Sequence, residues 1–378
     1  MVPLARRNLF HDKMKLTTAL VGVVFSVVLV TSLGGLYIAS SDNATGIIRN
    51  AGGDLWIAAK GTRSIDLAEP ISRRRLYQTL ATPGVLWAEP LLMHFSQWRL
   101  SDGRQEVAEV VGLLPRSKLN LPWGMSAGKS QCIRHDDGVI IDERERKRFG
   151  SHNRLLEIGD RVEILNTRTR VAGFSQGVGS FTNIPYVFMT ERQARQCTQL
   201  GDEQTKFVVV KAAPEANVEQ LRHRLAAHMP DVDILTTDQF TRLTRDYWLF
   251  GTGVGMGIIF AAALGLIVGA VIVSQTIYAS TLDRLPEFGT LKALGMGNMR
   301  LALVIIQQAL LIGLMGNLLG TAAVSWLSGR MMEWHLPIEI PPWLYAAMIA
   351  LTVVMCAAAS VTSVLKVFRL PPATVFRS

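Results

Sequence analysis

Four long stretches of this sequence carry no Asp, Glu, Lys or Arg, and they constrain the fold more than any other feature: 16–41, 247–282, 301–329 and 340–365. Each exceeds the roughly 20 residues that an α-helix needs to cross the hydrocarbon core of a bilayer. Because unpaired backbone polar groups are costly in lipid, such stretches are expected to be helical. The sequence therefore predicts an α-helical membrane protein with four transmembrane helices.

The net charge of +9 is unevenly distributed, and its distribution predicts the orientation in the membrane. Residues 1–15, 283–300 and 366–378 together hold ten Lys or Arg and three acidic residues, whereas 42–246 holds 28 and 25. Lys and Arg concentrate on the cytoplasmic side of membrane proteins. We therefore expect a multi-pass membrane protein with both termini in the cytoplasm. Most of the excess basic charge is explained in this way, so a nucleic-acid-binding surface is not indicated.

The segment between the first two predicted spans is long enough to fold as a domain. Stretches of strand composition, such as 107–113, alternate with helical ones, such as 217–228, where apolar residues recur at spacings of three and four. We expect a large α+β periplasmic domain inserted between the first and second transmembrane helices. No Gly or Pro lies between Asp231 and Phe250, which leaves open whether this domain is joined rigidly to the second span.

These observations predict the organisation of the whole chain. In the lipid bilayer we expect transmembrane spans at 16–40, 247–280, 301–328 and 341–365, with a periplasmic domain at 41–246. The remaining predicted parts are a cytoplasmic amphipathic segment at 1–15, a cytoplasmic loop at 281–300, a short periplasmic loop at 329–340 and a cytoplasmic tail at 366–378.

Glycines four residues apart occur in two of the predicted spans. Gly265 and Gly269 lie in the second span, and Gly316 and Gly320 lie in the third. Small residues at this spacing allow membrane helices to approach closely. The pattern predicts helix packing at these four positions, but it leaves open whether the facing helix belongs to the same chain or to a second copy.

No arrangement of residues in the sequence indicates a catalytic centre. The stretch 124–130 contains two glycines and a Lys-Ser pair, but three residues separate the glycines where a phosphate-binding loop has four, so we interpret it as a flexible loop. We therefore expect no catalytic residue and no bound cofactor in this chain.

The possible metal ligands and cysteines are equally uninformative. Cys132, His135, Asp136 and Asp137 lack the second cluster that would complete a metal site, so no metal is expected. Cys132 and Cys197 both lie in the predicted external domain, where the sequence leaves open a disulfide or two thiols.

The polar connector at 283–300 joins two uncharged stretches, and its basic flanks Arg284 and Arg300 place it on the cytoplasmic side. We interpret it as a docking element for a cytoplasmic partner. Its central stretch at 287–295, EFGTLKALG, resembles the signature of FtsX-like permeases of the MacB type, most closely their DevC branch. Residues 4–9, 156–162 and 372–377 are similar to other parts of the same family.

The resemblance implies a permease subunit of an ABC-type exporter that works as a homodimer with a separate ATP-binding cassette subunit, to which ATP and Mg²⁺ belong. It also implies that the connector forms a coupling helix, through which ATP-driven motion of the partner reaches the periplasmic domain. Carried over by position, the coupling element comprises Leu285, Glu287, Gly289, Leu291, Leu294 and Gly295. The sequence departs from the family pattern at Pro286 and Gln307.

Three functions fit this architecture. The first is efflux of a hydrophobic or amphiphilic substrate with a periplasmic membrane-fusion adaptor and an outer-membrane channel. The second is a non-transporting FtsX-type regulator of a cell-wall hydrolase, and the third is a lipoprotein-releasing permease. An adaptor bound to the external domain would separate the exporter from the regulator.

Overall fold

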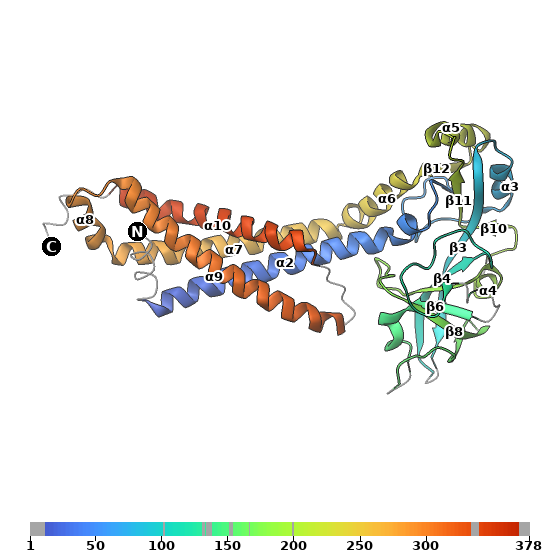
Figure 1. The fold of residues 1–378 in the computed structure, drawn as a ribbon, viewed down its shortest axis with the longest axis horizontal. Coiled ribbons are helices and arrows are strands. Elements are labelled where there is room, and N and C mark those ends of the chain that lie inside the picture. Colours follow the sequence, from blue (N-terminus) through green and yellow to red (C-terminus); the bar gives the residue numbers. More distant parts are fainter. Residues whose placement is uncertain are drawn as a thin grey trace. The chain divides into compact units, whose positions relative to one another are not determined.

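The chain divides into two compact units, a helical unit made of Met1–Ala39 with Gly255–Ser378 and an α+β unit made of Ser40–Val254. Figure 1 shows the elements of the computed structural model. It describes residues 12–100, 103–130, 133, 138–150, 154–165, 167–198, 200–333 and 340–369.

Among the described residues, four helices are long and apolar enough to cross a membrane. They are α2 (Lys13–Asn50), α7 (Val254–Asp283), α9 (Asn298–Glu333) and α10 (Pro342–Phe368). Their shared core contains Val23 of α2, Ile277 of α7, Ile305 of α9 and Met355 of α10. A buried amide of α9 also bonds to α10, because Asn317 Nδ2 donates to Thr352 Oγ1 at 3.0 Å.

Helix α7 begins at Val254, seven residues after the predicted start of the second span at 247. Residues Tyr247–Gly251 instead form a π-helical turn, η3. Gly253 then adopts a φ of +79°, a left-handed conformation that favours glycine and interrupts an α-helix. The α+β unit and the second membrane helix are therefore not joined by one uninterrupted α-helix.

The α+β unit is built on a mixed sheet, in which the described part of the chain contributes ten strands. The order is β12-β1-β11-β3-β4-β9-β6-β8-β5, and β7 pairs with β3 and β8. The strands are β1 (Leu55–Ala59), β3 (Val85–Arg99), β4 (Gln105–Leu113), β5 (Met125–Ala127), β6 (Gly138–Asp142), β7 (Arg161–Ile164), β8 (Thr167–Ser175), β9 (Tyr186–Thr190), β11 (Phe207–Ala212) and β12 (Val232–Thr236).

Strand β3 is long enough to pair with strands of both halves of this sheet. Its first half pairs with β11, as at Leu91 with Phe207, and its second half pairs with β4, as at Leu92 with Gly112. Most neighbours are antiparallel, but β4 with β9 and β6 with β8 are parallel. The stretch 124–130, which we interpreted from the sequence as a flexible loop, contains strand β5. Its backbone pairs with β8, so this part of the interpretation was wrong.

Short elements complete the α+β unit. They are β2 (Ile71–Ser72), which pairs with β10 (Gln204–Thr205), the helices α3 (Arg74–Leu80), α4 (Glu191–Gln196), α5 (Val218–His228) and α6 (Thr237–Asp246), and the 3₁₀ turn η2 (Glu143–Arg146). Helix α6 joins the core through Phe240, whose ring lies 5.5 Å from that of Trp56 in β1. Capping by Thr236, which accepts from the backbone of Gln239, fixes where α6 begins.

Candidate functional site

Helix α8 (Leu285–Ala293) forms the connector between α7 and α9 at one end of the helical unit (Figure 1). Pro286 lies in its first turn, where the missing N–H costs nothing and the fixed φ suits a helix. The helix ends at Ala293, and Gly295, two residues later, has a φ of +92°. The N–H of Met296 donates to the carbonyl of Leu291 at 3.0 Å, which satisfies one of the last carbonyls.

The inner face of α8 is anchored in the helical unit. The Phe288 side chain is only 3% exposed and belongs to the same apolar core as Ala19 of α2 and Leu301 of α9. Gly289 beside it is also buried, and Leu291 packs at the edge of this core. Burial of a phenylalanine side chain stabilises by about 1.5–3 kcal/mol, so α8 is held firmly against the membrane helices.

The opposite side of α8, which we call the outward face, consists of Glu287, Thr290 and Leu294. The Glu287 side chain is 65% exposed, and its one ion pair among the described residues is a long contact with Arg284, at 3.9 Å. Leu294 is 84% exposed, and Met299 just beyond it is 70% exposed. These exposed apolar side chains are the candidate contact points of the connector for a partner.

The six predicted coupling residues differ in their exposure to solvent. Glu287, Leu294 and Gly295 are exposed, Leu285 and Leu291 are half-buried, and Gly289 is buried. Sequence reasoning missed the anchoring role of Phe288. Its spacing of three from both Leu285 and Leu291 was the signal for an inner apolar face.

Gln307, one of the two positions at which the sequence departs from the family pattern, lies on α9. Its Oε1 atom is buried and has no hydrogen-bond partner among the described residues.

The four glycines predicted to pack helices all face α2 of the same chain. A Cβ atom built at Gly265 would overlap Leu29, and one at Gly269 would lie 2.6 Å from Ser26 Cβ. These contacts bring α7 against α2.

The second glycine pair does the same for α9. A Cβ at Gly316 would lie 2.6 Å from Val23 Cβ, and one at Gly320 would lie 2.8 Å from Val27 Cβ. Within the single chain, all four glycine positions therefore lie against α2.

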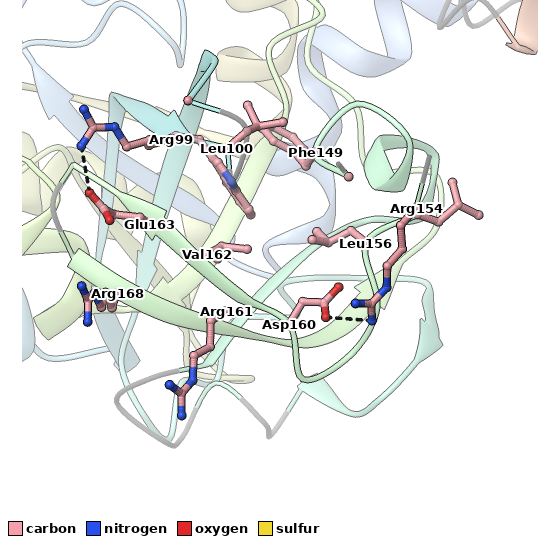
Figure 2. Close-up of a pocket in the computed structure, with 14 residues that line it drawn as sticks. Arg99, Leu100, Phe149, Arg154, Leu156, Asp160, Arg161, Val162, Glu163 and Arg168 are labelled. Atoms are coloured by element: carbon pink, nitrogen blue, oxygen red, sulfur yellow. Dashed lines mark hydrogen bonds and ion pairs between the residues drawn. The ribbon is translucent and has the colours of Figure 1, made fainter. Parts of the chain in front are cut away.

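The α+β unit also contains an open pocket of about 600 Å³, shown in Figure 2. Buried apolar side chains line part of it: Trp98, Leu100, Phe149, Leu156 and Val162. The other lining side chains include four arginines and two acids: Arg99, Arg154, Arg161, Arg168, Asp160 and Glu163.

Ion pairs neutralise half of the arginines in this pocket. Arg99 pairs with Glu163 at 3.6 Å, and Arg154 Nη2 donates to Asp160 at 3.2 Å (Figure 2). Arg161, like Arg168, is exposed and makes no ion pair with any other described residue. The pocket thus combines an apolar lining with a positively charged rim, which suits an amphiphile with an acidic group.

Within the described ranges, no group of three or more His, Cys, Asp or Glu lies close enough to hold a metal ion. Cys197 carries a free buried thiol there, and burial raises its pKa. The predicted candidates Cys132, His135, Asp136 and Asp137 lie outside the described residues.

The geometry defines a class of protein, a multi-pass membrane protein with an α+β domain inserted between its first and second membrane helices. Residues 16–228 match the model of the MacB-like periplasmic core domain, and residues 259–372 match that of the FtsX-like permease C-terminal region. The chain belongs to the family of MacB/FtsX-type permeases.

Relatives of this chain carry consistent names. Uncharacterized ABC transporter permeases of Mycobacterium tuberculosis strain H37Rv and of Mycobacterium bovis are each 24% identical over 377 residues, covering 98% of both chains. One from Methanocaldococcus jannaschii is 23% identical over 180 residues, which cover 45% of this chain and 44% of the relative.

A solved structure of the periplasmic region of MacB from Actinobacillus actinomycetemcomitans is also similar. It has a TM-score of 0.38 and 13% identity, and the match covers 52% of this chain and 94% of that one. The family matches and the names of the relatives make this chain an ABC transporter permease of the MacB/FtsX type, a family that implies an ATP-binding partner.

Proposed function

We propose that this chain is the permease subunit of an ABC exporter and that it transmits ATP-driven motion of a separate nucleotide-binding subunit to its α+β domain. The observation that carries the proposal is the two-sided α8. Its inner face is fixed by Phe288, while its outward face presents Leu294 and Glu287 for contact with a partner. ATP and Mg²⁺ would then belong to that partner.

Two features of the helical unit support transmission of force. Because Phe288 is buried among residues of α2 and α9, a push on the outward face moves those helices and does not simply bend α8. Helix α2 is continuous from Lys13 to Asn50, so it carries displacement along its whole length.

The proposed orientation places α8 and both termini in the cytoplasm and the α+β unit in the periplasm of a bacterial inner membrane. The concentration of Lys and Arg in the connector and in the terminal segments supports it. Homodimerisation is proposed from the family resemblance, and it requires a surface other than the four glycines, which α2 of the same chain already covers.

For the substrate we propose a hydrophobic or amphiphilic molecule, exported with a membrane-fusion adaptor and an outer-membrane channel as in the DevC branch. The apolar lining and the arginine rim of the pocket in Figure 2 support an amphiphile with an acidic group. Crosslinking of the α+β unit to an adaptor supports this exporter. Crosslinking to a cell-wall hydrolase instead would replace it with the regulatory function.

The coupling proposal is tested by changing Leu294 to Asp. The variant places a carboxylate in an apolar contact, so we expect binding of the co-purifying ATP-binding subunit to weaken by about tenfold or more, as for the loss of an interface hot spot. Co-purification from detergent and the ATPase rate of the complex are the measurements. Leu86→Asp changes another exposed leucine, 55% exposed and in the α+β unit, and serves as the control.

Normal assembly together with a normal ATPase rate in Leu294→Asp would sink the docking proposal.

A further inference from the structure

The carboxylate of Asp66 is buried in the α+β unit and bonds to the segment that leads to the second membrane helix. Trp248 Nε1 donates to its Oδ2 atom at 2.8 Å. Ser64 Oγ donates to the same oxygen at 3.2 Å, and the Tyr186 hydroxyl donates to Oδ1 at 3.3 Å. Hydrogen bonds to an ionised acceptor away from water are among the stronger ones in proteins.

The indole of Trp248 is held by its face as well as by its N–H group. It stacks on the ring of Phe181, with centroids 4.6 Å apart and an interplanar angle of 25°. Leu249, the next residue, is fully buried. Both residues lie in η3, and single π-helical turns occur frequently at functional sites.

The helix before η3 is fixed in the same unit. Phe240 of α6 is fully buried against Trp56, and Thr237 Oγ1 donates to the carbonyl of Gly53 at 2.7 Å. From Thr237 to Leu249, therefore, the chain is attached to the α+β core at several points.

Attachment ends abruptly after η3. Gly253 has a φ of +79°, and no heavy atom of the described residues lies within 4 Å of a Cβ built there. The boundary between the two compact units falls immediately afterwards, between Val254 and Gly255. A glycine in open space is free to change its backbone angles without steric cost.

We propose that the Asp66–Trp248 pair is a clamp that keeps η3 part of the α+β unit, so that Gly253 is the hinge at which the backbone between η3 and α7 rotates during the ATPase cycle. The inference rests on the proposed transmission function. It specifies where rotation occurs and which side chains keep the segment before the hinge from unwinding.

The clamp is tested by hydrogen–deuterium exchange on the full chain in detergent, without any partner. Trp248→Phe keeps an aromatic ring, although a smaller one, and loses the N–H bond, and Asp66→Asn removes the charge of the acceptor. In both we expect amide exchange at 244–250 to accelerate by about tenfold, the change expected when local opening becomes that much easier. Exchange in α5 stays unchanged, because α5 packs elsewhere in the unit.

Two further variants keep this test decisive. Phe181→Leu removes the stacking and leaves the N–H bond, so we expect it to accelerate exchange of the same amides. It supplies the test if the other variants fail to fold. Trp326→Phe changes an exposed tryptophan of α9 and is the matched control. Unchanged exchange at 244–250 in well-folded Trp248→Phe and Phe181→Leu would overturn the clamp.

The hinge is tested in the complex with the co-purifying ATP-binding subunit. Gly253→Ala adds a methyl group in open space but strains the left-handed backbone, so we expect the coupled ATPase rate to fall by about threefold or more. Gly257→Ala, within α7 and also in open space, leaves the rate unchanged.

Equal rates in Gly253→Ala and wild type overturn the hinge. They leave the docking proposal standing if Leu294→Asp still uncouples the partner, so the two failures are distinguishable.

Discussion

Single residues in the α+β unit show how burial changes their chemistry. Glu109 of β4 is 1% exposed, and its Oε2 atom has no hydrogen-bond partner within the described part of the chain. Burial raises its pKa well above the ordinary value, and the nearby Asp66 carboxylate raises it further. Burial also raises the pKa of Asp66, although its bonds to Trp248 and Ser64 oppose this. Glu109, whose Oε2 atom lacks any such bond among the described residues, is favoured in its neutral form.

We predict that Glu109→Gln stabilises the α+β unit at neutral pH. The folded chain keeps the proton of Glu109 at a pH where the unfolded chain has released it. The stability from this group is thus present at low pH and is lost as pH rises through the raised pKa of the folded state. Glu109→Gln removes this pH-dependent loss of stability. We therefore expect it to raise the Tm at pH 7 by roughly 2–4 °C, the shift that about 1 kcal/mol produces in a domain of this size.

The measurement is thermal unfolding of the full chain in detergent between pH 5 and pH 8, followed by tryptophan fluorescence. Wild type should lose stability as pH rises across part of this range, while Glu109→Gln should show a flatter profile. Exposed Glu203→Gln is the control. Parallel pH profiles for Glu109→Gln and wild type would show that Glu109 does not titrate as described.

At the scale of elements, α8 and the glycine contacts have complementary roles. The glycine pairs let α7 and α9 lie directly against α2, and Phe288 ties α8 to the resulting bundle. Since interiors are close-packed, displacement of one of these elements is felt by the others. This packing fixes α8 on the helical bundle and leaves its outward face available for contact with a partner.

We predict that Gly316→Ala and Gly320→Ala each destabilise the helical unit by about 1–3 kcal/mol, the usual cost of overpacking. The added methyl group meets Val23 or Val27, whose branched side chains are stiff and cannot swing aside. Gly329→Ala is the matched control, because it lies on the same helix with no described heavy atom within 4 Å.

Thermal unfolding in detergent compares the three variants. Equal Tm values for Gly316→Ala and Gly329→Ala would contradict the packing described for α9.

At the scale of the whole molecule, much of the architecture was predictable because lipid imposes simple rules on sequence. The uncharged stretches predicted four membrane helices, and strand and helix patterns predicted an α+β domain between the first two. Both predictions are confirmed by the family matches and the fold. The EFGTLKALG stretch resembled the right family for the same reason: its signature is local.

Features that depend on distant contacts were not predictable. The pair Gly316 and Gly320 indicated a close approach, yet spacing carries no information about which helix approaches. Periodicity in α8 did not distinguish Phe288, which faces the core, from Leu294, which faces solvent, because both are large and apolar. The Asp66–Trp248 bond joins residues 182 positions apart in the sequence, so no local pattern reveals it.

The central claim is that the state of the ATP-binding subunit, sensed at the outward face of α8, reaches the α+β unit. Hydrogen–deuterium exchange at 244–254, measured on the complex with and without ATP, tests this claim most directly. We predict that ATP changes exchange in this segment in wild type but not in Leu294→Asp. An ATP-dependent change of equal size in Leu294→Asp, or none in wild type, would contradict the account.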